Sequence, residues 1–582
     1  MKSSNELRAS LRMIDHKSYP AYKSLAGAWQ FAGYTLVIDH VQGDPFASPS
    51  SVHVEVSGQA AGFPAAYLER DCSRVALQDY LTRLLAGQFG QYNFKAKGSG
   101  KSGLLSISRP GQEVLERSAC EMTGQKVTAR FQIGFPAFGR TINAGELEKI
   151  LFEFLPRCVE NSLYYRNINQ REAERAVFLA EDQEEIRNQL RERGWVAFVA
   201  NGAVLPRVSG VSELPMKDSV PFSSPASMER TLTLPHRGEL SGMAVEAGVT
   251  LIVGGGYHGK STLLEAMQAG VYNHVAGDGR EYVITDETAV KLRAEDGRSI
   301  RNVDISLFIN DLPNHKDTVR FTTADASGST SQAAGLVESM EAGSGLFLID
   351  EDTSATNFMV RDEFMQQVIS RDKEPITPFI ERVRDLYEKA GISTIMVAGS
   401  SGAFFYIADR ILQMDCYRAK DITERVKAMC KDRPVNPPMP RPFNGLCGQR
   451  VLPAYVRSAS GHGGRGRGMR ERDSREAAGS RHEHMKIKTF GLESFSLDKE
   501  SISVRYLEQL TDTEQTAALA YLLRFCLEQT LDGKRTVSQA VRLVYDTLNK
   551  KGWEPFCSSY VPCGLARPRI QEVYACLNRF RG

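Results

Sequence analysis

The spacing of apolar residues divides the chain into regions of different character. In the first 200 residues, Val52–Val56 alternates as a half-buried strand does, and Gly145–Leu155 repeats its apolar residues at helical intervals. The run Gln170–Arg193 is dense in Glu and Arg and predicts a helix covered by solvent. These patterns predict an α+β N-terminal domain over 1–205, ending where Pro and Ser become frequent.

A second pattern begins near residue 240 and continues to about 420. Three apolar runs, Thr250–Gly254, Gly345–Asp350 and Ser393–Gly399, alternate with helical stretches. Strands that are apolar on both faces are typical of a parallel sheet covered by helices. We therefore expect an α/β domain over 206–455.

The last part of the chain contains two further segments. A tract that includes GHGGRGRGMR cannot bury a core, so 456–485 is expected to be a disordered linker. Leu507–Leu548 has helical periodicity and predicts a small helical domain over 486–582. No stretch approaches the roughly 18 apolar residues that a bilayer requires. We expect a soluble intracellular protein, cytoplasmic in the first instance, with mitochondria and nucleus left open.

Charge and cysteine content narrow the possible partners. The chain has 72 Lys and Arg against 70 Asp and Glu, so a nucleic-acid surface would have to be a local patch. None of the ten cysteines forms a CxxC pair, which indicates isolated thiols in a reducing compartment.

One motif carries the strongest chemical signal. The segment GGGYHGKST matches G-x-x-x-x-G-K-[ST] between an apolar strand and a helix, as a phosphate loop requires. Lys260 would bridge the β- and γ-phosphates, and Ser261 would offer its hydroxyl to Mg²⁺. The residues predicted to bind ATP here are Gly254, Gly255, Gly256, Tyr257, His258, Gly259, Lys260, Ser261 and Thr262.

A partner motif, LFLIDED, lies about 90 residues further on. Asp350 ends an apolar strand, where its carboxylate can hold the same Mg²⁺. Glu351 follows and is placed to polarise a water for attack on the γ-phosphate. We predict Glu351 and Lys260 as the catalytic residues.

Between these motifs, DASGSTSQAAG places Ser327, Gly328 and Ser329 before a predicted helix. The turn could be a second anion site or a simple helix N-cap. Since one chain needs only one phosphate cradle, a second suggests that a neighbouring copy supplies the γ-phosphate. That interpretation predicts a homodimer.

The order of these motifs resembles the ATP-binding cassette (ABC) class, in which two cassettes enclose two ATP molecules. Longer strings, among them TLIVGGGYHGKSTLL and LIDEDTSATNFMVRD, resemble the predicted ATPases of the ABC class, a family that includes a kinetoplastid mitochondrial RNA-editing ATPase. The resemblance implies a P-loop NTPase of ABC-cassette type between an α+β N-terminal domain and a small helical C-terminal domain. It also implies a homodimer with a basic pore for RNA.

The sequence departs from the wider class at several positions. Asp352 stands where proline is usual, and Asn357 where aspartate is. Ser400 and Ser401 replace the switch histidine, and only Asn310 suggests itself as the Mg²⁺-sensing residue. We therefore predict slow hydrolysis. Phe222 could stack on adenine or simply pack.

Two basic segments are candidates for contact with RNA. The segment GSGKSG forms a basic, Gly-rich turn with Lys95, Lys97 and its own Lys101. It is not a second phosphate loop, because Lys95 occupies the required glycine position. This turn could contact a nucleic-acid backbone or form a solvated hairpin tip. Arg465 and Arg467, in the Gly/Arg tract, could bind phosphates or belong to a solubilising linker.

A different class of function also fits the sequence. The chain could be a nucleotide-gated scaffold that binds ATP without significant turnover, which the missing switch histidine favours. A small-molecule kinase is less favoured, because the Ser-Gly motif would have no role in it. A transporter subunit is disfavoured because the chain contains no membrane segment.

Overall fold

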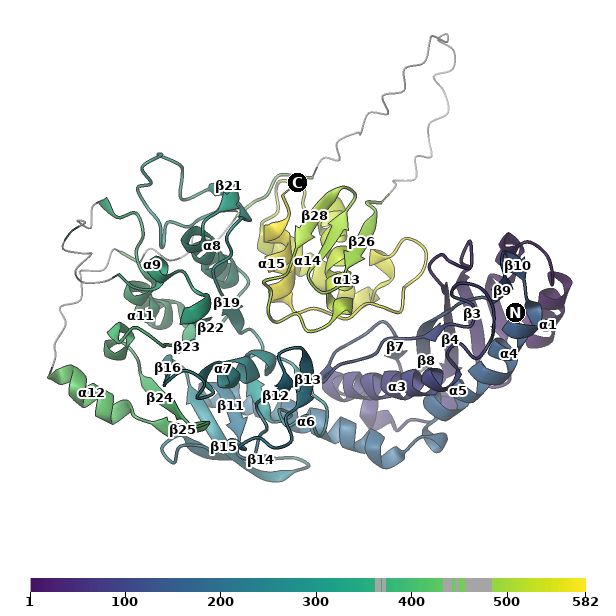
Figure 1. Cartoon of the computed structure of the whole chain (residues 1–582), viewed down its shortest axis with the longest axis horizontal. Coiled ribbons are helices and arrows are strands. Elements are labelled where there is room, and N and C mark those ends of the chain that lie inside the picture. The colour runs from purple at the N-terminus through teal and green to yellow at the C-terminus, as the bar shows by residue number, and fades with distance from the viewer. Residues whose placement is uncertain are drawn as a thin grey trace, which may run out of the picture.

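The structure is a computed structural model, and it describes residues 2–361, 368, 373–432, 442–443, 445, 450–455 and 484–581. Figure 1 shows three parts, with the C-terminal region lying between the ATPase region and the N-terminal region. Arg465 and Arg467, together with most of the predicted linker 456–485, lie outside the described residues.

The N-terminal domain is built on one seven-stranded sheet with strand order β1-β2-β3-β4-β8-β5 and β7 paired to β8. The predicted strand Val52–Val56 lies in β4 and alternates buried and half-buried residues. Its strands are β1 (Lys2–Ser3), β2 (Gly27–Gln30), β3 (Thr35–His40), β4 (Ser50–Ser57), β5 (Leu105–Ser106), β7 (Cys120–Met122) and β8 (Lys126–Ile133). Its main helices are α1 (Ser4–Met13), α3 (Asp71–Tyr92), α4 (Ala144–Lys149) and α5 (Leu155–Leu163).

The ATPase domain contains a six-stranded sheet with order β19-β22-β23-β16-β24-β25. All neighbours are parallel except the β24–β25 pair. The three predicted apolar strands form β16, β22 and β23, whose central residues are buried on both faces. The strands are β16 (Val249–Val253), β19 (Val290–Leu292), β22 (Leu346–Asp350), β23 (Ser393–Val397), β24 (Arg410–Asp415) and β25 (Arg418–Asp421). The helices are α7 (Lys260–Ala269), α8 (Gly328–Glu341), α9 (Thr356–Met359), α11 (Phe379–Ala390) and α12 (Thr423–Lys431).

A separate antiparallel sheet, with order β14-β15-β11-β18, lies beside this parallel sheet. Strand β11 precedes the predicted boundary at residue 205, yet it pairs with both β15 and β18. The four strands are β11 (Trp195–Ala200), β14 (Glu229–Leu234), β15 (Gly238–Glu246) and β18 (Val283–Thr285). Three short pairs complete the strands of this half: β12 (Arg207–Ser209) with β13 (Ser212–Pro215), β20 (Arg298–Val303) with β21 (Phe321–Ala326), and β17 (Asn273–His274) with β6 (Glu113–Val114).

Helix α6 (Gln170–Arg193) joins the N-terminal and ATPase domains. The expectation that solvent covers this helix is wrong. Gln183 and Arg187 are buried, and they donate hydrogen bonds to backbone carbonyls of the ATPase domain, including that of Thr285 at 2.9 Å. These contacts explain why a polar sequence lies inside the molecule, since each buried donor has an acceptor.

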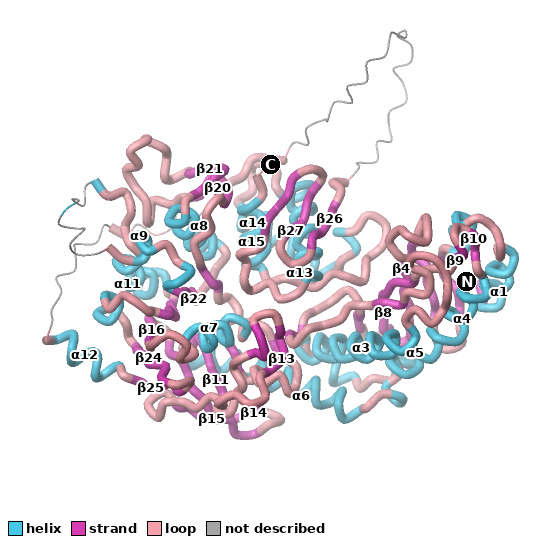
Figure 2. Tube along the Cα trace, in the orientation of Figure 1, coloured by secondary structure: helices cyan, strands magenta, loops and turns pink. Residues whose placement is uncertain are grey.

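The C-terminal region is largely helical, as expected, and also contains a short sheet that the sequence did not reveal. Its helices are α13 (Thr513–Phe525), α14 (Val537–Lys551) and α15 (Ile570–Arg579). Its antiparallel strands are β26 (Ile487–Phe490), β27 (Ser494–Leu497) and β28 (Glu500–Ser503). Strands β26 and β27 pack against α13, and β28 packs against α15 (Figure 2).

The C-terminal region is bonded to both other parts. Arg117 of the N-terminal domain is 2% exposed and pairs with Asp512 and Glu514, each at 2.7 Å. Gln509 donates hydrogen bonds to the carbonyls of Gln268 and Ala289 in the ATPase domain. Among the described helices, none is both long and apolar enough to cross a bilayer.

Candidate ATP site

The phosphate loop connects the end of β16 to the N-terminus of α7. Backbone N–H groups of the loop and of the first turn of the helix are therefore available to phosphate oxygens. Two of its glycines are required by geometry. Gly254 has φ +143°, and a Cβ there would meet the carbonyl oxygen of Met414 on β24. Gly259, with φ +94°, is the N-cap of α7. Tyr257 also has a positive φ and is fully exposed.

The predicted lysine, serine and aspartate of the site lie at one edge of the sheet. Lys260 donates hydrogen bonds from Nζ to the carbonyls of Gly254 and Gly255, both at 2.8 Å. Ser261 donates from Oγ to Oδ2 of Asp350 at 3.3 Å. Strands β16 and β22 run parallel with one strand between them, so their carboxyl ends meet at this edge. This hydroxyl and carboxylate are oxygen ligands of the kind that Mg²⁺ prefers.

Glu351 is held by the loop that follows β23, the strand between β22 and β16. Its Oε2 accepts hydrogen bonds from the N–H groups of Gly399 and Ser400 at 2.6 and 3.0 Å, and the Ser400 hydroxyl donates to Oε1. Burial alone would raise the pKa of Glu351. These hydrogen bonds favour the charged form and leave the pKa below its ordinary value. Ser400 therefore positions the carboxylate, a role that the sequence did not reveal.

The Ser-Gly motif begins α8, a 14-residue helix. Ser327 occupies the N-cap position in an extended conformation, yet within the described structure its side chain makes no capping hydrogen bond. Its Oγ lies 3.0 Å from Oγ1 of Thr330 instead. Gly328 is half-buried and Ser329 is buried. The simple N-cap alternative does not describe what the Ser327 hydroxyl does.

Helix α8 is bonded directly to the end of the Asp350 strand. The buried Gln332 accepts from the N–H of Ala355 at 2.9 Å and donates to Oγ of Ser354 at 3.0 Å. Ser354 in turn donates to the carbonyl of Asp350 at 2.9 Å. These hydrogen bonds connect the helix of the Ser-Gly motif directly to the strand end that carries Asp350.

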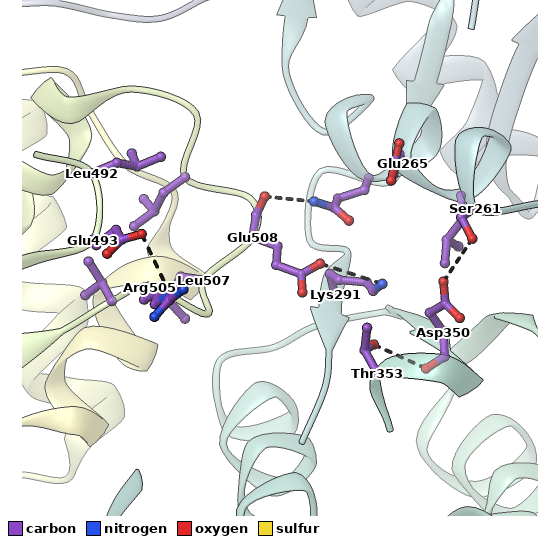
Figure 3. Close-up of a pocket in the computed structure, with 14 residues that line it drawn as sticks. Ser261, Glu265, Lys291, Asp350, Thr353, Leu492, Glu493, Arg505, Leu507 and Glu508 are labelled. Carbon is purple, nitrogen blue, oxygen red and sulfur yellow. Dashed lines mark hydrogen bonds and ion pairs between the residues drawn. The ribbon is translucent and has the colours of Figure 1, made fainter. Parts of the chain in front are cut away.

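A cavity of about 430 Å³ adjoins the Ser261–Asp350 pair and reaches the C-terminal region (Figure 3). Its walls include Glu265 of α7 and Glu508 of the C-terminal region. Burial raises the pKa of the Glu265 carboxyl. Glu508 pairs with Arg293 at 2.5 Å. The C-terminal region thus forms one wall of the cavity beside the predicted metal ligands.

Two minor candidates have other local roles. Asn310 donates from its amide to the carbonyl of Ser306 at 2.6 Å, within its own turn. Phe222 is 3% exposed and packs in the core with Met228 and Leu412. Of the two alternatives for Phe222, packing is the one that its burial supports.

The lysine turn lies on the N-terminal domain, where Lys95 and Lys97 are exposed and Lys101 is half-buried. The N–H of Lys101 donates to the carbonyl of Pro45 at 2.8 Å, and that of Ser99 to the carbonyl of Ala137 at 2.7 Å. Sequence reasoning missed three phenylalanines that are bonded to this turn or adjacent to residues bonded to it. They are exposed to 63%, 48% and 64%: Phe46, Phe94 and Phe138. Their separation in the sequence hides this grouping.

The strand order and phosphate loop define a P-loop ATPase domain of the cassette class. Three family models match the chain: the P-loop domain of the ABC ATPases over 169–441, the N-terminal domain of ATPases of the ABC class over 4–166, and the MRB1590 C-terminal domain over 486–582. The chain belongs to this family of ABC-class ATPases.

Individual relatives match only parts of the chain. Uncharacterized protein MJ1628 of Methanocaldococcus jannaschii is 29% identical over 253 residues, which are 41% of this chain and 54% of that protein. The chain thus spans about half the length of this curated relative. The ADP conformation of MJ1267, an ATP-binding cassette of an ABC transporter, aligns with 41% of this chain and 96% of its own at 12% identity, with a TM-score of 0.25. The structure of cbiO1 from Clostridium perfringens aligns with 41% of this chain and 96% of its own. Its sequence identity is 12%, and the TM-score is 0.26.

Proposed function

We propose that the protein is a homodimeric, slowly hydrolysing ATPase that clamps or remodels RNA. The observation that carries the dimer is the N-terminus of α8, whose Ser327 hydroxyl makes no capping bond within the described structure. Backbone N–H groups at a helix N-terminus attract phosphate. The phosphate loop already supplies one such cradle at α7. A second copy gives the α8 terminus a ligand, because each ATP then lies between one phosphate loop and the partner copy's Ser-Gly turn.

The site residues divide the work of hydrolysis among them. Lys260 exchanges its two carbonyl acceptors for phosphate oxygens and so binds the β- and γ-phosphates. Ser261 and Asp350 would hold Mg²⁺, which neutralises phosphate charge when it is bound. Glu351 orients and polarises the attacking water. Because the loop at Ser400 already occupies both oxygens of this carboxylate, activating water costs hydrogen bonds, which supports slow turnover.

A surface on the N-terminal domain supports RNA as the ligand. We define the phenylalanine–lysine surface as Phe46, Phe94, Phe138, Lys95, Lys97 and Lys101. Exposed aromatic rings stack on bases without sequence preference, and lysines contact the phosphates between them. Arg140, 79% exposed on its side chain, adds a further cation beside Phe138, partly offset by Asp44 at 2.7 Å.

Mixing two inactive variants tests the shared site. Lys260→Ala removes the phosphate-loop lysine, and Ser327→Arg blocks the α8 N-terminus. In a mixed dimer one of the two sites keeps both intact halves, so an equal mixture should recover up to roughly a quarter of wild-type phosphate release. Each variant alone should be inactive. Mixtures that stay at the background of the single variants would contradict a site shared between copies.

A trapping variant tests the dimer directly. Glu351→Gln removes the charged carboxylate but keeps the shape of the side chain, so ATP and Mg²⁺ should accumulate a closed dimer. Light scattering should show a doubling of mass on addition of ATP, and a monomer under all conditions would exclude the sandwich.

Binding of single-stranded RNA tests the phenylalanine–lysine surface. Replacing Phe46, Phe94 and Phe138 together by Ala should weaken binding at least about tenfold, since stacking contributes roughly 1–3 kcal/mol per base. Phe490→Ala is a matched control, because Phe490 is 54% exposed on another domain. Crosslinking with and without residues 457–485 would separate any contribution of the Gly/Arg tract. If wild-type protein recovers no more crosslinked RNA than a tag-only control does, the proposed RNA ligand is wrong.

The scaffold function is the second candidate, and the engaged Glu351 carboxylate favours it. The two candidates differ in phosphate release. Wild type should exceed Lys260→Ala in release if the protein is an ATPase, whereas equal rates would favour a scaffold.

A further inference from the structure

The phosphate loop is fastened to a neighbouring hairpin turn. His258, inside the loop, faces the turn that joins β24 and β25. The N–H of Cys416 donates to Nδ1 of His258 at 3.0 Å, and the N–H of Tyr417 donates to the His258 carbonyl at 3.2 Å. The turn therefore contacts both the backbone and the side chain of the loop.

Three potential metal ligands meet at this contact. Ligand atoms of His258, Asp415 and Cys416 lie within 4.8 Å of one another, and no other group of three His, Cys, Asp or Glu among the described residues is so close. The distance from Nδ1 of His258 to Oδ1 of Asp415 is 3.5 Å. Ligand atoms bound to one tetrahedral ion at about 2.0–2.3 Å are roughly 3.3–3.8 Å apart. Small side-chain movements would therefore bring all three to one ion.

The surroundings leave these ligands accessible. Cys416 is exposed, and His258 and Asp415 retain side-chain exposures of 36% and 39%. Lys420 binds Oδ2 of Asp415 at 2.7 Å, so it fixes the carboxylate through the oxygen that does not face His258.

We propose that His258, Asp415 and Cys416 form a binding site for a borderline divalent cation such as Zn²⁺. Imidazole nitrogen, thiolate sulfur and carboxylate oxygen are all zinc ligands, whereas Mg²⁺ prefers oxygen alone. Three protein ligands leave a fourth position for water. The site is distinct from the Ser261–Asp350 pair, although both adjoin the phosphate loop.

A cation at this site would link the phosphate loop to the β24–β25 turn through bonds stronger than the present hydrogen bonds. Because His258 belongs to the loop, cation binding and triphosphate binding would be energetically coupled. Any factor by which the cation changes triphosphate affinity must equal the factor by which triphosphate changes cation affinity. The site therefore offers a way for metal availability to act on the ATPase.

Cobalt binding tests the proposal on the full, reduced chain in excess Mg²⁺. Co²⁺ should bind with one equivalent per chain and give a thiolate-to-metal charge-transfer absorption that Zn²⁺ abolishes by displacement. Cys416→Ser should remove the absorption, and Asp415→Asn should weaken Co²⁺ affinity at least about tenfold. Cys430→Ser, which removes a half-buried thiol of α12, should change neither. Absence of the absorption in wild type, or its persistence in Cys416→Ser, would overturn the proposal.

A second measurement needs no variant and so does not depend on one folding. Zn²⁺ should slow alkylation of Cys416 in wild type at least about tenfold, while Cys430 reacts at an unchanged rate, as followed by mass spectrometry of the peptides. Equal Cys416 rates with and without Zn²⁺ would also refute the site. Both tests measure cation binding alone, so their outcome is independent of hydrolysis and of RNA.

Discussion

The hydrogen bonds to the Glu351 carboxylate keep it charged and also hold it in place. Hydrogen bonds from the Ser400 hydroxyl and from the Gly399, Ser400 and Ser401 N–H groups lower its pKa against the opposing effect of burial. The Glu351 carboxylate therefore stabilises the fold at pH values above the pKa that Glu351 has in the unfolded chain. This stabilisation is lost as the pH falls through the lower pKa that Glu351 has in the folded protein. The same bonds must loosen before a water takes their place.

Replacing Ser400 by Ala should shift the pH dependence of hydrolysis. The variant loses a donor to the charged carboxylate, so the pKa of Glu351 rises and the acidic limb of the kcat profile moves to higher pH. Stability at neutral pH should fall by about 1 kcal/mol. Phosphate release measured across pH, with urea unfolding alongside, checks both.

Ser401→Ala is the matched control, since the Ser401 hydroxyl accepts from the N–H of Ala403 at 3.3 Å and, among the described residues, donates no hydrogen bond to Glu351. Its backbone N–H to Glu351 remains. An acidic limb that does not move in Ser400→Ala, or moves equally in Ser401→Ala, would contradict the role assigned to the Ser400 hydroxyl.

At this scale, the sequence indicates candidate residues that share a motif, but it does not indicate those that come together only in the folded chain. Lys260, Ser261 and Asp350 could be predicted because the phosphate loop has a fixed spacing and Asp350 ends an apolar strand. Ser400 and Cys416 could not, because their partners Glu351 and His258 lie 49 and 158 residues away. These contacts depend on which strands are neighbours in the sheet, and a local sequence pattern does not encode that order.

At the scale of elements, the link between α8 and the end of β22 is the structure's route between two halves of the proposed site. Gln332 uses both ends of its amide, bonding to the backbone of Ala355 and the side chain of Ser354. In the proposed dimer, the α8 terminus of one copy would face the ATP of the other. A bond within one copy can therefore relate the two nucleotides.

Gln332→Ala should uncouple these elements. The change leaves the Ala355 N–H without its buried acceptor, so stability should fall by about 1–3 kcal/mol. ATP affinity should change little, whereas phosphate release should fall, which nucleotide-binding and release assays compare directly. Ser339→Ala on the same helix is the control, because the Ser339 hydroxyl donates to the Gly335 carbonyl within α8. Parallel losses in both variants would point to general destabilisation of α8.

Elements with a continuous or strictly periodic pattern were the ones that could be predicted. The apolar runs gave β16, β22 and β23, whose burial on both faces leaves little ambiguity. The strands β26–β28 are four residues each and are too short for a clear alternation. The polar residues of α6 indicate a solvated helix in the sequence. They are buried instead, because backbone carbonyls from other parts of the chain accept their hydrogen bonds.

At the scale of the molecule, one buried cation joins the first domain to the last. Arg117 is 2% exposed, whereas Asp512 and Glu514 are 15% and 17% exposed on their side chains. Arg117→Met should cost roughly 3–5 kcal/mol, because two partly buried carboxylates lose their counter-charge. Denaturant unfolding would measure the loss, and proteolysis would locate it at the domain junction.

Arg191→Met provides the comparison. Arg191 also forms two ion pairs, with Glu184 and Glu287 at 3.2 Å, but it is 52% exposed. Its loss should cost less than about 1 kcal/mol. Similar losses for the two arginines would mean that burial does not set the strength of the junction.

Helix α6 is a continuous connection between the N-terminal domain and the ATPase domain. It is an uninterrupted helix of 24 residues, packed against α3 at one end and against β11 at the other. A helix of this length spans about 36 Å, so a rotation of about 10° at the ATPase end displaces the far end by roughly 6 Å. In the proposed clamp, a tilt of this size at the ATPase end would move the N-terminal domain far enough to close on an RNA strand or release it.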